Sequence, residues 1–202
     1  MVAAFDVDGT LTTRDCVTPF LLRVAGARLI LALARRPVAT MAALARRDRN
    51  TLKELACRAF EGLDSARVDD LGVGFADEIV AGRLRADTLA RLSCHRHLGH
   101  VTILASASLD PYLEPLGRRL GVDAVLCTRL EREAGRLTGR LVGENCRAAE
   151  KARRVERWLA ENGLGEAELW AYGDSPGDRE LLAAADRPVW VGRASLVPDP
   201  FG

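Results

Sequence analysis

The chain has 202 residues, of which 48% are hydrophobic and 28% charged, and its formal net charge is +1. This composition supports a folded core, and the near-neutral charge argues against a general nucleic-acid-binding protein, whose basic excess would be plain. Five widely spaced cysteines without a CxxC pair favour reduced thiols over a disulfide framework. No run approaches the roughly 20 apolar residues of a membrane-spanning helix. Because the first predicted strand starts at the N-terminus, we expect no signal peptide and a cytoplasmic protein.

The N-terminal part is predicted to be one strand followed by a helical block. Val2–Phe5 is a short apolar run typical of a buried strand. From about residue 14 to residue 87, Ala, Leu and Arg dominate and no β-branched run occurs, which indicates helices. Proline and capping residues mark the expected helix starts within this block: Pro19, Pro37, Asn50 or Thr51, and Asp64 or Ser65.

The remainder of the chain alternates strands with helices. The expected strands are Val101–Ala105, Ala124–Cys127, Arg136–Val142, Glu168–Tyr172 and Pro188–Val191. The expected helices are Asp87–Cys94, Asp110–Leu120, Ala148–Glu161 and Asp178–Ala184. This alternation predicts an α/β fold with an open parallel sheet and right-handed crossovers, and we expect the tail after Arg193 to be loose.

Two carboxylates, Asp6 and Asp8, follow the first predicted strand. Side chains two residues apart in a strand point the same way. Open α/β sheets bind their ligands at the carboxyl ends of the strands. Two like charges there repel each other unless a cation or a shared proton relieves them. The segment Asp6–Thr10 therefore predicts a metal, a nucleophile and an acid/base group.

Four segments follow one another in a fixed order: Asp6–Thr10, Ser106 after an apolar run, Lys151 on a predicted helix, and Gly173–Asp178 after a predicted strand. Together they resemble the four motifs of the haloacid dehalogenase superfamily, and most closely its phosphoserine-phosphatase-like branch. The resemblance implies a Rossmann-like α/β core of residues 1–13 and 88–202 and an inserted helical C1 cap of residues 14–87. It implies a phosphoric monoester hydrolase that acts on a small phosphorylated substrate through an aspartyl-phosphate.

The resemblance also implies the catalytic roles. Asp6 is expected to be the nucleophile, and Asp8 the general acid and base. An Asp at position 8 is found in members that transfer phosphoryl groups, so it excludes a dehalogenase. Lys151 is expected to neutralise the phosphate, and Ser106 and Ala107 to bind its oxygens. The branch usually has Ser-Gly-Gly where this chain has Ser106-Ala107-Ser108, which puts phosphoserine itself in doubt as the substrate.

A Mg²⁺ ion is the expected cofactor. The resemblance implies Asp6, the backbone carbonyl of Asp8 and Asp174 as its protein ligands, in keeping with the preference of Mg²⁺ for oxygen donors. Asp178 lies four residues after Asp174, and we expect it to orient a metal-bound water or the catalytic lysine. Thr10 is expected to brace the first loop by a hydrogen bond.

Three further predictions concern residues outside the four motifs. Asp15 falls where the branch carries an acid that meets a substrate amino group, although a helix N-cap explains it equally well. Lys53 has no motif context and is interpreted as a surface residue. The segment Cys94–His97 with His100 lacks a second ligand pair at a zinc-site spacing, so we interpret it as a helix end followed by a loop.

The basic helical block is compatible with more than one class of substrate. From Cys16 to Lys53 there are eight basic residues and one acid, Asp48, among many Leu and Ala. Such a segment is either a solvated face around a core or a surface that lies on an anionic membrane. The alternatives to a small-molecule phosphatase are therefore a phosphatase for lysophosphatidate or a phosphatidylglycerophosphate-like lipid, or a non-catalytic phosphate-binding protein of the same fold. The sequence leaves the oligomeric state open.

Overall fold

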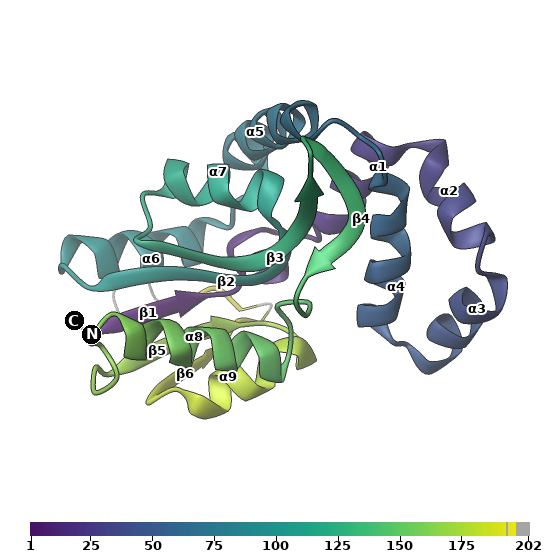
Figure 1. The fold of residues 1–202 in the computed structure, drawn as a ribbon. Coiled ribbons are helices and arrows are strands. Elements are labelled where there is room, and N and C mark those ends of the chain that lie inside the picture. The colour runs from purple at the N-terminus through teal and green to yellow at the C-terminus, as the bar shows by residue number, and fades with distance from the viewer. Residues whose placement is uncertain (193, 197–202) are drawn as a thin grey trace.

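A computed structural model describes residues 1–192 and 194–196, so most of the tail predicted to be loose lies outside the described residues. The core is one six-stranded sheet in the order β4-β3-β2-β1-β5-β6 (Figure 1). Its strands are β1 (Val2–Phe5), β2 (Val101–Leu109), β3 (Ala124–Glu133), β4 (Arg136–Val142), β5 (Leu169–Gly173) and β6 (Arg187–Trp190). All neighbouring pairs are parallel except β3 and β4, which form an antiparallel hairpin. The predicted α/β class is confirmed.

The central strand β1 is buried on both faces. Phe5 lies beside Leu104 of β2 and Tyr172 of β5. Ala3 and Phe5 face one hydrophobic cluster, and Val2 and Ala4 face the other. Figure 1 shows the two covering layers, with helices α6 (Ala86–His97) and α7 (Asp110–Leu120) on one face and α8 (Ala149–Glu161) and α9 (Arg179–Ala184) on the other. Burial on both faces explains why this strand is apolar throughout.

The helical block forms between β1 and α6. It contains α1 (Val17–Ala25), α2 (Ala27–Ala34), α3 (Pro37–Arg46), α4 (Arg49–Cys57), the short η2 (Arg58–Phe60) and α5 (Ser65–Gly82). In Figure 1, α4 lies next to β4, α2 and α3 lie on the far side of α4, and α5 lies on α7. Contact between α5 and α7 is close, because a Cβ at Gly72 would lie 2.0 Å from the carbonyl oxygen of Pro111.

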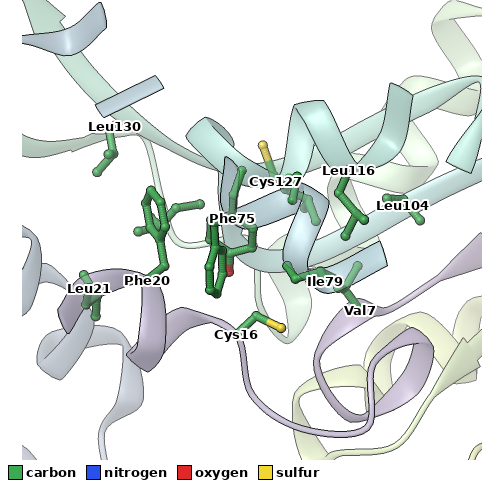
Figure 2. Packing of buried hydrophobic residues seen from close by; sticks show 14 of the residues in the cluster. Val7, Cys16, Phe20, Leu21, Phe75, Ile79, Leu104, Leu116, Cys127 and Leu130 are labelled. Atoms are coloured by element: carbon green, nitrogen blue, oxygen red, sulfur yellow. The ribbon is translucent and has the colours of Figure 1, made fainter. Parts of the chain in front are cut away.

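One hydrophobic cluster joins the block to the sheet (Figure 2). Phe20 of α1 and Phe75 of α5 pack against Tyr112 of α7, with ring centroids 4.8 Å and 5.3 Å from it. The same cluster includes Leu104 of β2. Aromatic pairs at these separations contribute about 0.5–1.5 kcal/mol each beyond the burial of their area. The ends of α1 and α5 are thus packed onto the sheet domain.

Several element boundaries differ from the prediction. Asp48, not Asn50 or Thr51, caps α4, because its carboxylate accepts hydrogen bonds from the N–H groups of both residues. Pro37 is the first residue of α3 and Asp64 caps α5, as predicted, whereas α1 begins before Pro19. Turn chemistry close to Asp48 decides the start of α4, and helical periodicity alone does not locate it.

Strand β2 continues past the expected end at Ala105. Its register against β3 shifts between Ala105 and Leu109. Ser106 therefore lies inside an irregular strand end rather than before a loop. An irregularity of this kind changes the direction in which side chains point, and it is common next to active sites.

Within the described residues, no single helix is long and apolar enough to cross a membrane. Helices α1 and α2 reach that length and composition only as a pair, and they are bent by 99°.

Candidate active site

Three neighbouring parallel strands bring the first and last predicted motifs together. Asp6 follows β1 and Asp174 follows β5, and β2 on the other side of β1 carries Ser106. Gly9 lies between Asp6 and the first helix with φ of 91°, and a Cβ there would lie 2.3 Å from Oδ2 of Asp174. Glycine is required at position 9, because a side chain there would collide with Asp174 and would strain the backbone at this positive φ. The aspartates converge at the carboxyl edge of the sheet, as predicted.

Lys151 and Asp178 complete an ionic group around Asp6. The Lys151 Nζ lies 2.7 Å from Oδ1 of Asp6 and also contacts Oδ1 of Asp178. All three side chains are buried. Oδ2 of Asp178 accepts hydrogen bonds from the N–H and the hydroxyl of Ser175, at 3.0 Å and 2.7 Å. Asp178 thus holds the lysine, which is one of the two roles expected of it.

The carboxylates also form a group that fits a divalent cation. One oxygen each from Asp6, Asp174 and Asp178 lies within 4.8 Å of the others. Thr10 Oγ1 donates to Oδ1 of Asp174 at 3.2 Å, so the expected bracing by Thr10 is present. A set of hard oxygen donors suits Mg²⁺. The carboxylate of Asp8 lies outside this group, and the role expected of its backbone carbonyl stays a prediction.

Burial and charge set the ionisation of this group. Burial raises the pKa of Asp6 to about 7, with the carboxylates of Asp178 and Asp8 adding to the rise and Lys151 opposing it. Burial alone would lower the pKa of Lys151, but the two carboxylates that it contacts outweigh burial and raise it. Lys151 is therefore a permanent cation. A bound divalent cation would further favour the ionised form of Asp6.

Asp8 reaches the site from a turn rather than from a strand. The strand alternation ends at Phe5, because residues Val7–Leu11 form a turn in which Asp8 and Gly9 have non-helical backbone angles. Oδ1 of Asp8 accepts a hydrogen bond from the N–H of Cys16, and Oδ2 accepts one from Ser108 Oγ, both at 2.8 Å. Burial raises the pKa of Asp8, and the hydrogen bond from Ser108 partly opposes this rise. A raised pKa suits a carboxyl group that must carry a proton.

Ser108 is a site residue that the sequence analysis did not find. Besides holding Asp8, its N–H donates to the Oγ of Ser106 at 3.2 Å. Ser106 is buried, and its binding of phosphate stays a prediction. A second hydroxyl two residues after Ser106 was the available signal, since side chains at that spacing share a face of a strand.

Lys53 is a second residue that the sequence analysis missed, and its interpretation as a surface residue is wrong. It is buried, and its Nζ contacts the carbonyl oxygen of Ala107 and Oδ1 of Asn145, the latter at 3.1 Å. Burial lowers its pKa to about 8. The inward face of α4 also carries Ala56 and Cys57, so helical packing places this lysine among buried residues.

Asn145 joins this contact to other parts of the chain. Its Oδ1 also accepts from Thr128 Oγ1, and its Nδ2 donates to Oδ1 of Asn50, both at 2.7 Å. Helix α4 is thereby hydrogen-bonded to the segment before α8, and through Asn145 it is linked to Thr128 of β3. Such a network connects the helical block to the strand that carries the predicted phosphate-binding residues.

Asp15 is exposed at the start of α1. Its two carboxylate oxygens accept from the N–H groups of Val17 and Thr18, at 3.0 Å and 3.1 Å. These hydrogen bonds are those of a helix N-cap, the alternative role that the sequence analysis gave for Asp15. Its charge also contributes to the raised pKa of Asp8, although less than burial does. A contact with substrate stays a prediction.

The histidine and cysteine segment is a helix end, as interpreted. Helix α6 ends at His97. His95 is buried, with ring nitrogens 2.9 Å from the hydroxyl of Tyr172 and 3.0 Å from Nδ1 of His100. Burial lowers its pKa to about 4. In the part of the chain that the structure describes, the aspartate group is the one cluster of three metal-capable side chains.

The fold and this group of residues define a class of phosphoryl-transfer hydrolase, and comparison with known proteins gives the family. A family model described as haloacid dehalogenase-like hydrolase matches residues 3–183. The chain belongs to that family.

Among curated relatives, the protein CicA of Caulobacter vibrioides is 37% identical over 188 residues, which cover 92% of this chain and 83% of CicA. The phosphoserine phosphatase SerB1 of Mycobacterium tuberculosis is 31% identical over 131 residues, which cover 65% of this chain and 42% of SerB1. The predicted superfamily and its phosphoserine-phosphatase-like branch are confirmed, and these relatives indicate a phosphoric monoester hydrolase.

Solved structures share the fold. A protein of unknown function from Bordetella pertussis has a TM-score of 0.73 at 25% identity, covering 94% of this chain and 88% of its own. A substrate-bound phosphoserine phosphatase has a TM-score of 0.64 at 17% identity, covering 91% of this chain and 82% of its own. At that identity the second likeness shows the fold alone.

Proposed function

We propose that this chain is a Mg²⁺-dependent phosphatase that hydrolyses a small phosphomonoester in the cytoplasm through an aspartyl-phosphate on Asp6. The observation that carries the proposal is the placement of Asp6 at the carboxyl end of the central strand, buried and 2.7 Å from the ammonium of Lys151. A carboxylate held beside a fixed cation can attack phosphorus while the negative charge of the phosphoryl group is balanced.

The reaction has two steps. In the first, a carboxylate oxygen of Asp6 attacks phosphorus, the bond from phosphorus to the ester oxygen breaks, and Asp8 donates a proton to the departing alcohol. In the second, water attacks the same phosphorus, Asp8 takes the proton of that water, and inorganic phosphate leaves Asp6. The raised pKa of Asp8 supports the first step, because a proton is retained closer to neutral pH.

The surrounding residues would hold the phosphoryl group and the cation. Asp6, Asp174 and the carbonyl of Asp8 would bind Mg²⁺, which supplies positive charge to the phosphoryl oxygens when bound. Ser106 and Ala107 would bind phosphoryl oxygens from β2. Asp178 would hold Lys151 in place through the contact described above.

The substrate class follows from the relatives and from the helical block. Relatives named phosphoserine phosphatases favour a small phosphomonoester, and Asp15 would meet an amino group on such a substrate. We assign residues 14–87 to a cap over the site and residues 1–13 and 88–202 to the core. The contacts of Lys53 support a block that lies close to the site, since they join α4 to Ala107 of β2, a predicted phosphate-binding residue, and to Asn145 before α8.

The test is hydrolysis of p-nitrophenyl phosphate with Mg²⁺ and with EDTA, for the natural chain and for Asp6→Asn. We expect activity to require Mg²⁺ and Asp6→Asn to lower kcat by about 10⁴-fold or more. Acid quenching with ³²P-labelled substrate should trap a hydroxylamine-sensitive phosphoenzyme in the natural chain. Asp70→Asn, at an exposed position of α5, is the matched control. Phosphate binding without any turnover would instead support the non-catalytic alternative, which the presence of both Asp6 and Asp8 disfavours.

A further inference from the structure

The outward face of α2 is apolar. Its exposed residues include Ala27, Ile30, Leu31 and Ala34, which are spaced as one stripe along a helix. Ile30 is 71% exposed and Leu31 is 51% exposed. A helix on a protein surface normally turns its polar residues to solvent. The one polar residue of α2, Arg28, is also exposed, so most of the outward face of this helix is apolar.

Helix α3 also exposes apolar side chains. Val38 is 81% exposed, Met41 64% and Leu44 52%. We call Ile30, Leu31, Val38, Met41 and Leu44 the α2–α3 patch. Figure 1 shows both helices on the far side of the helical block from the sheet. Clustered exposed apolar side chains mark a surface that meets a partner or a membrane, whereas single ones need no explanation.

Arginines flank the residues of the patch along the chain. Residues 26–50 contain six arginines and one acid, Asp48, so this segment carries a net charge of +5 in a chain whose total is +1. None of the six forms a salt bridge within the described residues, and the carboxylate of Asp48 is occupied as the cap of α4. Arg28 and Arg35 also line a cavity of about 240 Å³ together with Arg58, Leu31 and Glu61. Cationic groups are therefore concentrated in the segment that carries the apolar patch.

We propose that the α2–α3 patch docks on an anionic phospholipid bilayer. Its apolar side chains would enter the boundary between head groups and acyl chains, and the arginines would bind the lipid phosphates. An apolar helical face with flanking arginines is the pattern that binds in this way.

Charge favours lipid over a second copy of the chain. A two-fold contact between two such patches would bring two arginine-rich surfaces together, and like charges at an interface oppose association. An anionic bilayer offers the complementary charge to the arginines that flank the patch. The inference does not depend on the proposed phosphatase activity, because docking can be measured without turnover.

The test is co-sedimentation of the full chain with vesicles of phosphatidylcholine alone or with about 30% phosphatidylglycerol. We expect binding to the anionic vesicles only, and a steep loss of binding between about 0.05 M and about 0.5 M NaCl, because salt screens the attraction. The triple variant Ile30→Ser, Val38→Ser and Met41→Ser should abolish binding at low salt. These side chains are exposed, so we expect the variant to fold.

A second variant tests the charges. Arg35→Gln, Arg36→Gln and Arg47→Gln together should weaken binding to the anionic vesicles by about 100-fold, since each basic residue near an anionic surface contributes about 1 kcal/mol. Each triple variant has a control of the same chemistry at exposed positions elsewhere. These controls are Val73→Ser, Val80→Ser and Leu98→Ser, and Arg118→Gln, Arg157→Gln and Arg179→Gln.

The controls should bind as the natural chain does, and all variants should retain its far-UV circular dichroism. Lack of binding by the natural chain at low salt would overturn the proposal, as would equal losses in test and control variants. A concentration-dependent dimer that the apolar triple variant abolishes, together with no vesicle binding, would assign the patch to self-association instead.

Discussion

The hydroxyl of Ser108 donates a hydrogen bond of 2.8 Å to Oδ2 of Asp8, and so joins the turn after β1 to the end of β2. The other oxygen of Asp8 accepts from the N–H of Cys16, just before α1. Asp8 is thus fixed by one group from the sheet and one from the start of the helical block. Because both oxygens of this carboxyl group are hydrogen-bonded, its orientation is fixed before substrate binds. Substrate binding therefore costs no further conformational entropy of this side chain.

Replacement of Asp8 should separate the two chemical steps. In Asp8→Asn, p-nitrophenyl phosphate still has a good leaving group, so the phosphoenzyme should form, but its hydrolysis lacks a base. We expect a burst of p-nitrophenol equivalent to the enzyme concentration, followed by a steady rate lower by about 10²–10⁴-fold. Stopped-flow absorbance measures both phases. An alkyl phosphate should give no burst, and equal behaviour of the two substrates would show that Asp8 is structural.

Loss of the Ser108 hydroxyl should shift the pH profile. Its hydrogen bond favours the ionised carboxylate of Asp8 and so lowers its pKa. Removal by Ser108→Ala should raise that pKa, so Asp8 would stay protonated to higher pH. We expect the alkaline limb of kcat/KM for an alkyl phosphate to move upward. Ser108→Thr keeps a hydroxyl and should restore the natural profile, whereas identical profiles for all three proteins would contradict the role.

Lys53 should affect substrate binding more than chemistry. Lys53→Met removes a donor from the carbonyl oxygen of Ala107 and from Oδ1 of Asn145, which leaves β2 less firmly held next to the phosphate. We expect KM to rise about tenfold with a smaller change in kcat, and the free energy of unfolding to fall by about 1–3 kcal/mol. Steady-state kinetics and urea unfolding measure the two effects. Glu54→Gln, on the exposed side of α4, should change neither.

His95 should make stability depend on pH. Burial lowers its pKa from 6.5 to about 4, so between these values the unfolded chain binds a proton that the folded chain does not. Its contribution to stability is therefore complete above pH 6.5 and is lost as the pH falls towards 4, by on the order of 2 kcal/mol. Urea unfolding at a series of pH values should show a flatter dependence for His95→Gln. The exposed His97→Gln serves as control, and an unchanged slope for His95→Gln would contradict the assignment.

The fold class was predictable because local patterns decide it. An apolar strand that ends in Asp6 and helices that alternate with strands after residue 100 require a parallel sheet with helices on both faces, which the structure has. Asp6 was marked by its place at the end of the first strand, whereas Lys151 and Asp174 were predicted from the resemblance of their segments to the family motifs. The topology then brings these positions to one edge of the sheet.

Tertiary structure alone decided which other side chains join the site and which faces turn outward. Lys53 is 92 residues from Asn145 and Ser108 is 100 residues from Asp8, so no local pattern links either pair. The apolar spacing of α2 is visible in the sequence, but periodicity does not say whether Ile30 faces the core or solvent. The sequence by itself determined the sheet and the order of its acidic motifs. The partners of Lys53 and Ser108, and the exposure of Ile30, depend on packing between helices and strands that lie far apart along the chain.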